Sequence, residues 1–162
     1  MATILNLAVS GEIIKVDPGL GLREMEMRRI FILPRVERWF LEDLPSTNSS
    51  WNIEVTPSEQ LDALFYEFCS GQPLQIGKRF KSLIHLGDGV WQLKTADLRL
   101  FGWFAHKDCF IASDCDDADK IKRMKLYKPY CEQSVRFRCA LNLDEPKFIV
   151  GDDPNYAVSD CY

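Results

Sequence analysis

The sequence predicts an α+β domain in which a small antiparallel sheet packs against two or more helices. The sheet is expected to combine a three-stranded meander with one or more N-terminal strands. Residues 90–112 support this prediction, because apolar and polar side chains alternate there in short runs separated by turn residues. Residues 56–71 add a helix cap followed by apolar residues at helical spacing. A length of 162 residues suits one domain with its own core.

The N-terminal region divides into an extension and the first elements of the domain. Residues 1–26 are rich in Ile, Leu and Val around a Ser10-Gly11 turn, which predicts a hairpin added to the main sheet. Residues 27–33 predict a short strand, and Pro34 suits the first turn of a helix. The apolar face of that helix is predicted to carry Val36, Phe40 and Leu41.

The strongest helix signal is the segment TPSEQLDALFYEFCSG. Thr56 is the predicted N-cap, Pro57 opens the first turn and Glu59 completes a capping box. Gly71 is a suitable stop, because glycine adopts the left-handed conformation that ends many helices. The apolar stripe of this helix consists of Leu61, Leu64, Phe65 and Phe68.

Three strands are predicted next, over residues 90–94, 98–104 and 109–112. Turn residues separate them, and alternation in the first two predicts a sheet with one face on the core. Aromatic residues are favoured in strands, so those found here are expected to fill the core rather than to stack on nucleic-acid bases. These residues are Trp91, Phe101, Trp103 and Phe104.

Acidic and then basic residues follow the strands. Residues 114–127 predict a helix, because four acids lie where the helix dipole favours negative charge. Pro129 is expected to end or kink that helix. Residues 132–143 suit either a helix or a strand, and both alternatives remain open. Residues 144–162 predict a polar, loosely held tail, so the domain proper is expected to span residues 27–143.

Composition excludes several classes of protein. No apolar run approaches the roughly 20 residues of a membrane-spanning helix, and the N-terminus lacks the basic start of a secretory signal. We therefore expect a cytoplasmic protein without membrane contact. The six cysteines lack Cys-x-x-Cys spacing, so free thiols are expected and no metal site. A net charge of −4 argues against sequence-independent nucleic-acid binding but is compatible with a local basic patch.

One part of the chain resembles a known family. A short loop at residues 86–89 leads into the strand VWQLK, the middle strand LRLF carries Arg99, and the closing strand CFIA is apolar. Together with the preceding strand and two helices, these segments resemble the RelE/ParE superfamily of toxin–antitoxin toxins, especially its HigB-like and phage-derived branch. The resemblance covers about 100 of the 162 residues, from Arg28 to Tyr127. The chain is longer and more acidic than is usual for that family.

The resemblance implies a toxin that cleaves mRNA, usually on the ribosome, without a metal or another cofactor. A cognate antitoxin protein would be its partner. In such enzymes the ribose 2′-hydroxyl attacks the adjacent phosphate, while the protein positions the RNA, neutralises charge and moves protons. Arg99 matches the family's mid-strand arginine. Arg123 and Tyr127 match the basic and aromatic residues that follow the closing strand, and are expected to share one helix face.

Further candidates surround these three residues. Residues 120–138 contain seven basic residues and one acid, an excess that suits either RNA or an acidic partner such as an antitoxin tail. The predicted RNA-binding residues are Lys94, Lys122, Lys125 and Lys128. The predicted acid–base residues are His85 and His106.

Simpler interpretations compete with each of these assignments. Arg99 would point to solvent from the polar side of a half-buried sheet, the basic run would be a solvated helix end, and His106 would be an exposed turn residue. The same scaffold also suits a non-catalytic inhibitor of gyrase, a binder of a phage or host protein, or a structural descendant without activity. Residues 1–26 either cover a sheet edge or form a homodimer contact.

Overall fold

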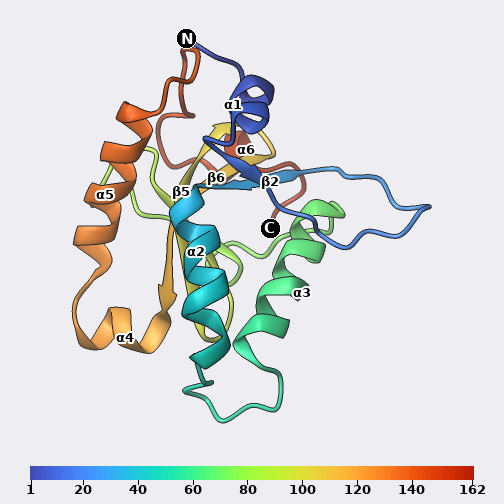
Figure 1. Ribbon diagram of the computed structural model, residues 1–162, viewed down its shortest axis with the longest axis vertical. Coiled ribbons are helices and arrows are strands. Elements are labelled where there is room, and N and C mark those ends of the chain that lie inside the picture. The colour runs from blue at the N-terminus through green and yellow to red at the C-terminus, as the bar shows by residue number, and fades with distance from the viewer.

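The computed structural model describes residues 1–162 and contains a six-stranded mixed sheet with helices on both faces (Figure 1). The strand order across the sheet is β1-β2-β6-β5-β4-β3. The strands are β1 (Ile14–Lys15), β2 (Arg29–Ile32), β3 (Phe80–Ser82), β4 (Trp91–Lys94), β5 (Leu98–His106) and β6 (Cys109–Asp117).

Six α-helices and one short 3₁₀ helix accompany the sheet. None of them combines the length and the apolar character needed to cross a membrane. The helices are α1 (Ile4–Ser10), α2 (Pro34–Glu42), the 3₁₀ helix η1 (Leu44–Ser46), α3 (Pro57–Cys69), α4 (Ala118–Arg123), α5 (Tyr127–Ala140) and α6 (Pro154–Ala157).

The α+β class is confirmed, but the sheet is larger than predicted and is not wholly antiparallel. β3, β4, β5 and β6 pair antiparallel in chain order, whereas β2 pairs in parallel with β6. A parallel pair needs a long crossover connection. Here the crossover contains α2 and α3 and then the antiparallel strands, so β2 joins the sheet beside the last strand rather than beside the next one.

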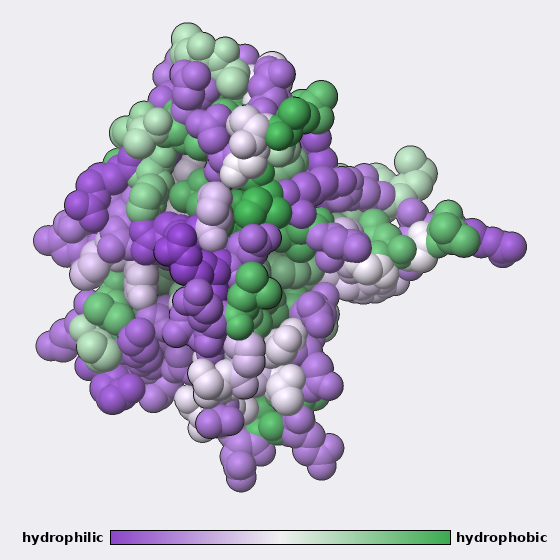
Figure 2. All heavy atoms as spheres, viewed as in Figure 1, coloured by the Kyte–Doolittle hydropathy of each residue, from purple (hydrophilic) through white to green (hydrophobic).

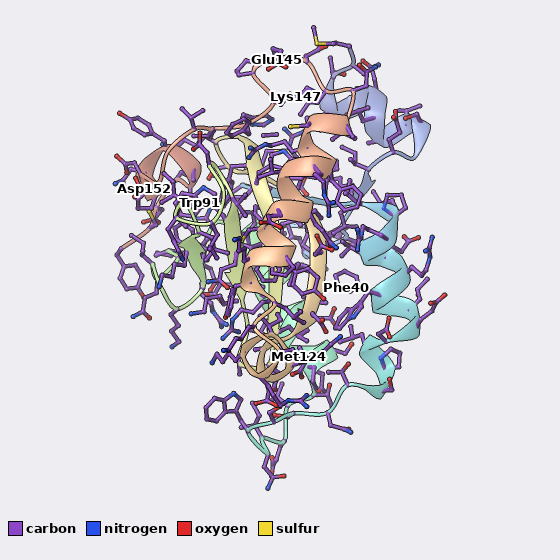
Figure 3. The ribbon with its side chains drawn as sticks, turned by 90° about the vertical axis from the view of Figure 1, so that its left-hand side faces the viewer. Phe40, Trp91, Met124, Glu145, Lys147 and Asp152 are labelled. Carbon is purple, nitrogen blue, oxygen red and sulfur yellow. The ribbon has the colours of Figure 1, made fainter.

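Helices cover both faces of the sheet. One face forms the main core with α2 and α3. The other face packs against α1 and α5, and Figure 3 shows α5 lying across the sheet. β5 is therefore buried from Leu98 to Ala105. The expectation of a sheet with one face on the core is wrong, because α5 covers the side on which the polar residues of β4 and β5 lie.

The predicted caps and core residues of the first two large helices are largely confirmed. The Thr56 side chain accepts a hydrogen bond from the Glu59 backbone, the Glu59 carboxylate binds the Thr56 N–H, and Gly71 has a φ of 84°. All four predicted stripe residues of α3 are buried. In α2, Val36 is buried, but Leu41 is 71% exposed because it lies on the side away from the core.

A helix replaces the N-terminal hairpin that the sequence predicted. Thr3 and Asn6 form a capping box at the start of α1, and Gly11 ends the helix in the left-handed conformation. Leu7 is completely buried against the sheet. Only β1 is extended, and it pairs antiparallel with β2 at the sheet edge. The loop between β1 and β2 projects from the body of the molecule (Figures 1 and 2). Leu22 in this loop is fully exposed.

The acidic run belongs to a strand, not to the predicted helix over residues 114–127. β6 continues to Asp117 by pairing with β5, and α4 covers only six residues. Lys125 has a left-handed φ of 55° and separates α4 from α5, so Arg123 and Tyr127 lie on different helices. Pro129 neither ends nor kinks a helix. It lies in the first turn of α5, where a missing N–H leaves no helical bond unmade.

The ion pair between Arg35 and Asp114 joins α2 to the middle of the sheet. The two charged groups approach to 3.0 Å, and Asp114 is only 4% exposed. Burial raises the pKa of the Asp114 carboxyl to about 6, against the opposing effect of the Arg35 charge. Its second oxygen, Oδ2, is buried without a hydrogen-bond partner. Burial of Asp114 in the strand therefore disfavours the ionised form of its carboxyl group.

We expect Asp114 to make the protein less stable as the pH rises. The folded-state pKa lies above the ordinary value of 3.8, so the stabilisation is complete below pH 4 and is lost as the pH rises through 6. A difference of this size corresponds to roughly 3 kcal/mol. Urea unfolding between pH 4 and 7.5 should show a smaller decrease in the free energy of unfolding for Asp114→Asn than for the wild type. Asp119→Asn, which alters an exposed carboxylate, should keep the wild-type slope.

The C-terminal residues, predicted to be loosely held, are packed into the domain. Ala157 and Val158 are completely buried in the main core. Backbone hydrogen bonds join Leu74 to Asp160 and to Tyr162. Ile149 and Cys161 pack against the same core, so this segment contributes to the core despite its polar composition.

The guanidinium of Arg28 binds this C-terminal segment to the end of α3. The side chain is 1% exposed, and its Nε lies 3.5 Å from Oδ1 of Asp108. Nη1 and Nη2 donate to four carbonyl oxygens of the main chain, which are those of Phe68, Gln72, Ser159 and Asp160. A single side chain thus satisfies acceptors from two distant segments.

Replacement of Arg28 by methionine should destabilise the fold severely. The change would leave the carbonyl oxygens of Gln72 and Ser159 without a donor, whereas those of Phe68 and Asp160 would keep one backbone donor each. Unpaired buried polar groups cost about 1–3 kcal/mol each. We expect a loss of at least about 3 kcal/mol in the free energy of unfolding, measured with urea. Arg29→Met provides a matched control, because the Arg29 side chain is partly exposed and its one hydrogen-bond partner is His106. Equal stabilities of the two variants would contradict the role assigned to Arg28.

All six cysteines carry free thiols. Cys69, Cys109, Cys115 and Cys131 are buried. Burial raises the pKa of Cys69 and of Cys131 to about 12, so these thiols are protonated and act as small apolar side chains.

Candidate anion-binding site

A pocket of about 320 Å³ opens where β3, β4 and β5 meet the connection between α4 and α5. We refer to it as the basic pocket. Four of its lining side chains are cationic and none is acidic. It is lined by Lys81, Leu83, His85, Leu86, Gln92, Lys94, Arg99, Lys122 and Tyr127.

The strand register brings the polar side chains of the pocket to one face of the sheet. Lys81 pairs with Gln92, and Lys94 pairs with Arg99. Directly paired residues of antiparallel strands project from the same face. This is the face covered by α5, whose first residue, Tyr127, packs edge-to-face on Phe101. The four polar side chains therefore converge beneath the start of α5.

Arg99 is buried without a carboxylate partner. The side chain is 7% exposed, and its guanidinium takes part in no ion pair. Nη1 donates to the carbonyl oxygens of Thr95 and Leu98, at 2.6 and 2.8 Å. Nε is buried without a hydrogen-bond partner. An unpaired buried charge is costly, so this guanidinium is suited to an anionic ligand.

Asp116, the acid paired with Arg99 on the same face of the sheet, is bound by other donors. Asp116 pairs with Arg99 in the strand register. Its Oδ2, however, accepts a hydrogen bond from the Tyr130 hydroxyl and lies 2.9 Å from Nζ of Lys120. Its Oδ1 accepts from the backbone of Asp117. Arg99 is left without a counter-ion because Tyr130, Lys120 and the Asp117 backbone bind the Asp116 carboxylate.

Lys94 is sensitive to the other charges of the pocket. Its Nζ donates to the Gly77 carbonyl at 2.7 Å. Burial, and then the positive charges of Arg99, Lys81 and Lys122, lower the pKa of Lys94 below its ordinary value. A bound anion would oppose that repulsion. The arrangement therefore favours an anion over a neutral ligand.

Gln92 adds an unsatisfied polar atom to the cationic groups. The side chain is 4% exposed, and its Oε1 is buried without a hydrogen-bond partner. This oxygen suits a hydroxyl or amino group placed beside the anion. The pocket thus offers cations for negative charge and an acceptor for a neighbouring donor.

The structure brings together five of the nine residues that the sequence singled out. The four others lie outside the basic pocket. Arg123 is 3.9 Å from Asp119, to which it is paired on the exposed side of α4. Lys125 and Lys128 are exposed on the α4–α5 connection and the first turn of α5. The five residues in the pocket are His85, Lys94, Arg99, Lys122 and Tyr127.

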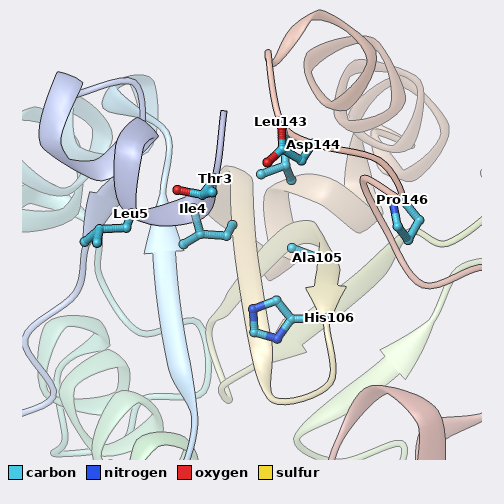
Figure 4. Close-up of a pocket in the computed structure, with 8 residues that line it drawn as sticks. All are labelled: Thr3, Ile4, Leu5, Ala105, His106, Leu143, Asp144 and Pro146. Atoms are coloured by element: carbon cyan, nitrogen blue, oxygen red, sulfur yellow. The ribbon is translucent and has the colours of Figure 1, made fainter. Parts of the chain in front are cut away.

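His106 is remote from these residues. It ends β5, seven positions after Arg99, and strands rise about 3.3 Å per residue, which separates the two by roughly 20 Å. It lines a different pocket with Thr3, Leu143 and other residues near the N-terminus (Figure 4). The exposed-turn interpretation fits this position better than a role beside Arg99.

Sequence reasoning missed Lys81 and Gln92 as site residues. Gln92 had a usable signal, since it is a polar residue flanked by large apolar residues in a strand. Lys81 had no such signal, because β3 has only three residues. Its place in the pocket depends on pairing with β4.

Comparisons with known proteins give no assignment: no family model matches the chain, and no curated protein or solved structure matches it significantly. No group of three or more His, Cys, Asp or Glu side chains is arranged to hold a metal ion. The groups available for chemistry in the basic pocket are the ammonium groups of its lysines, the Arg99 guanidinium, the His85 imidazole and the Tyr127 phenol.

Inorganic phosphate should stabilise the protein by binding to the basic pocket. A ligand at 100 times its Kd adds about 2.7 kcal/mol to the free energy of unfolding. Thermal unfolding in phosphate should therefore give a higher Tm than in chloride of equal ionic strength. Lys94→Gln should reduce this difference, whereas Lys128→Gln, the same change outside the pocket, should preserve it. An identical response of the two variants would contradict anion binding at this site.

Proposed function

We propose that the protein binds the RNA backbone in the basic pocket and cleaves it without a metal. The observation that carries this proposal is the buried, unpaired guanidinium of Arg99 among three lysines. Arginine and lysine recognise phosphate through charge-assisted hydrogen bonds. In a phosphodiester cleavage they also stabilise the extra negative charge of the transition state.

Proton transfer is the role proposed for His85 and Tyr127. His85 takes the proton from the ribose 2′-hydroxyl, whose oxygen forms a bond to the adjacent phosphorus. The bond from phosphorus to the 5′-oxygen breaks, and Tyr127 donates a proton to that oxygen. The products are a 2′,3′-cyclic phosphate and a 5′-hydroxyl. Both residues line the pocket that contains Arg99, which is the minimum requirement for this division of roles.

The order of elements supports a toxin of the RelE/ParE type. The chain passes through β2, α2 and α3 before the strands β4, β5 and β6, which is the order that the resemblance implied apart from the additional strand β3. Arg99 lies on β5, the middle strand of those three. On this proposal the substrate is mRNA, reached on the ribosome, and an antitoxin protein is the partner.

Cleavage and binding should respond to different substitutions. His85→Ala and Tyr127→Phe should each lower the cleavage rate roughly 100-fold, because general acid–base groups contribute about 100- to 10,000-fold. Tyr127→Phe keeps the packing on Phe101. Lys94→Gln and Lys122→Gln should instead weaken RNA binding. The measurements are single-turnover cleavage of a labelled RNA and its Kd at fixed salt.

Arg123→Gln and Lys128→Gln are the controls, because they remove equal charge from the same basic stretch outside the pocket. Induced expression in a bacterium should arrest growth and create new mRNA ends for the wild type but not for His85→Ala. RNA binding without cleavage would contradict the proposed nuclease activity and would favour a non-catalytic binding function. Growth arrest without new ends would instead indicate a protein target such as gyrase.

A further inference from the structure

A second pocket, of about 460 Å³, adjoins the basic pocket and shares Lys94 and Arg99 with it. The second pocket is also lined by Thr95 and Ala96 of the turn between β4 and β5. We refer to the second as the tryptophan pocket, because Trp51 is its largest side chain. It is lined by Trp51, Ile53, Lys78, Arg79, Lys94, Thr95, Ala96 and Arg99.

Trp51 differs from the other tryptophans in the extent of its exposure. Its side chain is 67% exposed, whereas Trp91 and Trp103 are almost completely buried. The indole Nε1 donates to the carbonyl oxygen of Ala96 at 3.2 Å. The polar atom of the ring is thus held by the β4–β5 turn while most of its apolar surface remains in solvent.

The segment that carries Trp51 is tied to the same turn by a second bond. The Ser50 backbone N–H donates to Oδ1 of Asp97 at 3.0 Å. Asp97 is itself 1% exposed and accepts from the Gln60 amide on α3. The indole is therefore anchored to the turn from which Arg99 is also held, through the Thr95 carbonyl.

Unpaired cations line the same pocket as the exposed ring. Lys78, Lys94 and Arg99 take part in no ion pair, whereas Arg79 is neutralised by Glu67 at 2.8 Å. Alternating aromatic and cationic groups along a groove are typical of proteins that bind single strands, because bases stack on the rings and phosphates meet the cations. Acidic side chains of a protein partner would bind the cations, but they would not provide a planar ring to stack on the indole of Trp51.

We propose that the tryptophan pocket receives an unpaired base of single-stranded RNA, stacked on Trp51, while the adjoining phosphate lies in the basic pocket between Lys94 and Arg99. The inference rests on the proposed function and specifies its substrate class. The bases of a duplex are stacked on one another and are not free to stack on a side chain. The two pockets together therefore select single-stranded RNA over duplex RNA.

The test compares labelled single-stranded RNA, its duplex and inorganic tripolyphosphate as ligands of the intact protein. Trp51→Ala should weaken binding of the single strand roughly 5- to 150-fold, since base–aromatic stacking contributes about 1–3 kcal/mol. Trp51→Phe, which keeps a ring, should lose less. Affinity for tripolyphosphate should stay unchanged in both variants, because it has no base. Tyr156→Ala removes an equally exposed aromatic ring elsewhere and should have no effect.

Two outcomes would overturn the inference. One is an unchanged affinity of Trp51→Ala for the single strand, and the other is equal affinity of the wild type for duplex and single strand. Either result would leave the proposed function standing if Lys94→Gln still weakened binding of every ligand. Loss of that Lys94 effect would instead overturn phosphate binding in the basic pocket, and the substrate class with it.

Discussion

The buried guanidinium of Arg28 is the contact on which the arrangement of the C-terminal segment and of the connection after α3 depends. It binds carbonyl oxygens at the end of α3 and close to the C-terminus, from a position just before β2. The segment after α3 runs from this point to β3, the edge strand that carries Lys81. β3 pairs with β4 and completes the basic pocket. The Arg28 contact therefore holds the start of the connection that leads to a candidate site residue.

A comparison of the two buried arginines distinguishes structure from function. Arg28 donates to four carbonyl oxygens and lies near the Asp108 carboxylate, so the protein itself compensates for its burial. Arg99 has two carbonyl acceptors and no carboxylate partner. The Nε atoms of both arginines are buried without a hydrogen-bond partner, so the difference lies in the number of carbonyl acceptors and in the nearby carboxylate. Incomplete compensation next to a pocket is typical of a position that awaits a ligand.

The distribution of acids explains how a chain of net charge −4 contains a basic pocket. On the face of the sheet covered by α5, Asp114 pairs with Arg35 and Asp116 with Lys120. These contacts hold α2 and α4 against β6 and use the carboxylates that would otherwise offset Arg99. The acidic run, which suits a helix N-terminus by its sequence, is thus engaged by other cations, and no acid lines the basic pocket.

The sequence by itself determined the features that arise within a few residues: the capped helix α3 and the positions of β4 and β5. Capping and alternation are local interactions, and they act before any distant contact forms. Only the tertiary structure decided the parallel pairing of β2 with β6, the extension of β6 through the acids and the separation of Arg123 from Tyr127. It also decided that Lys81 and Lys122 meet at one pocket. Strand pairing and burial against distant segments decide such features, and they outweigh local preferences such as that of acids for a helix start.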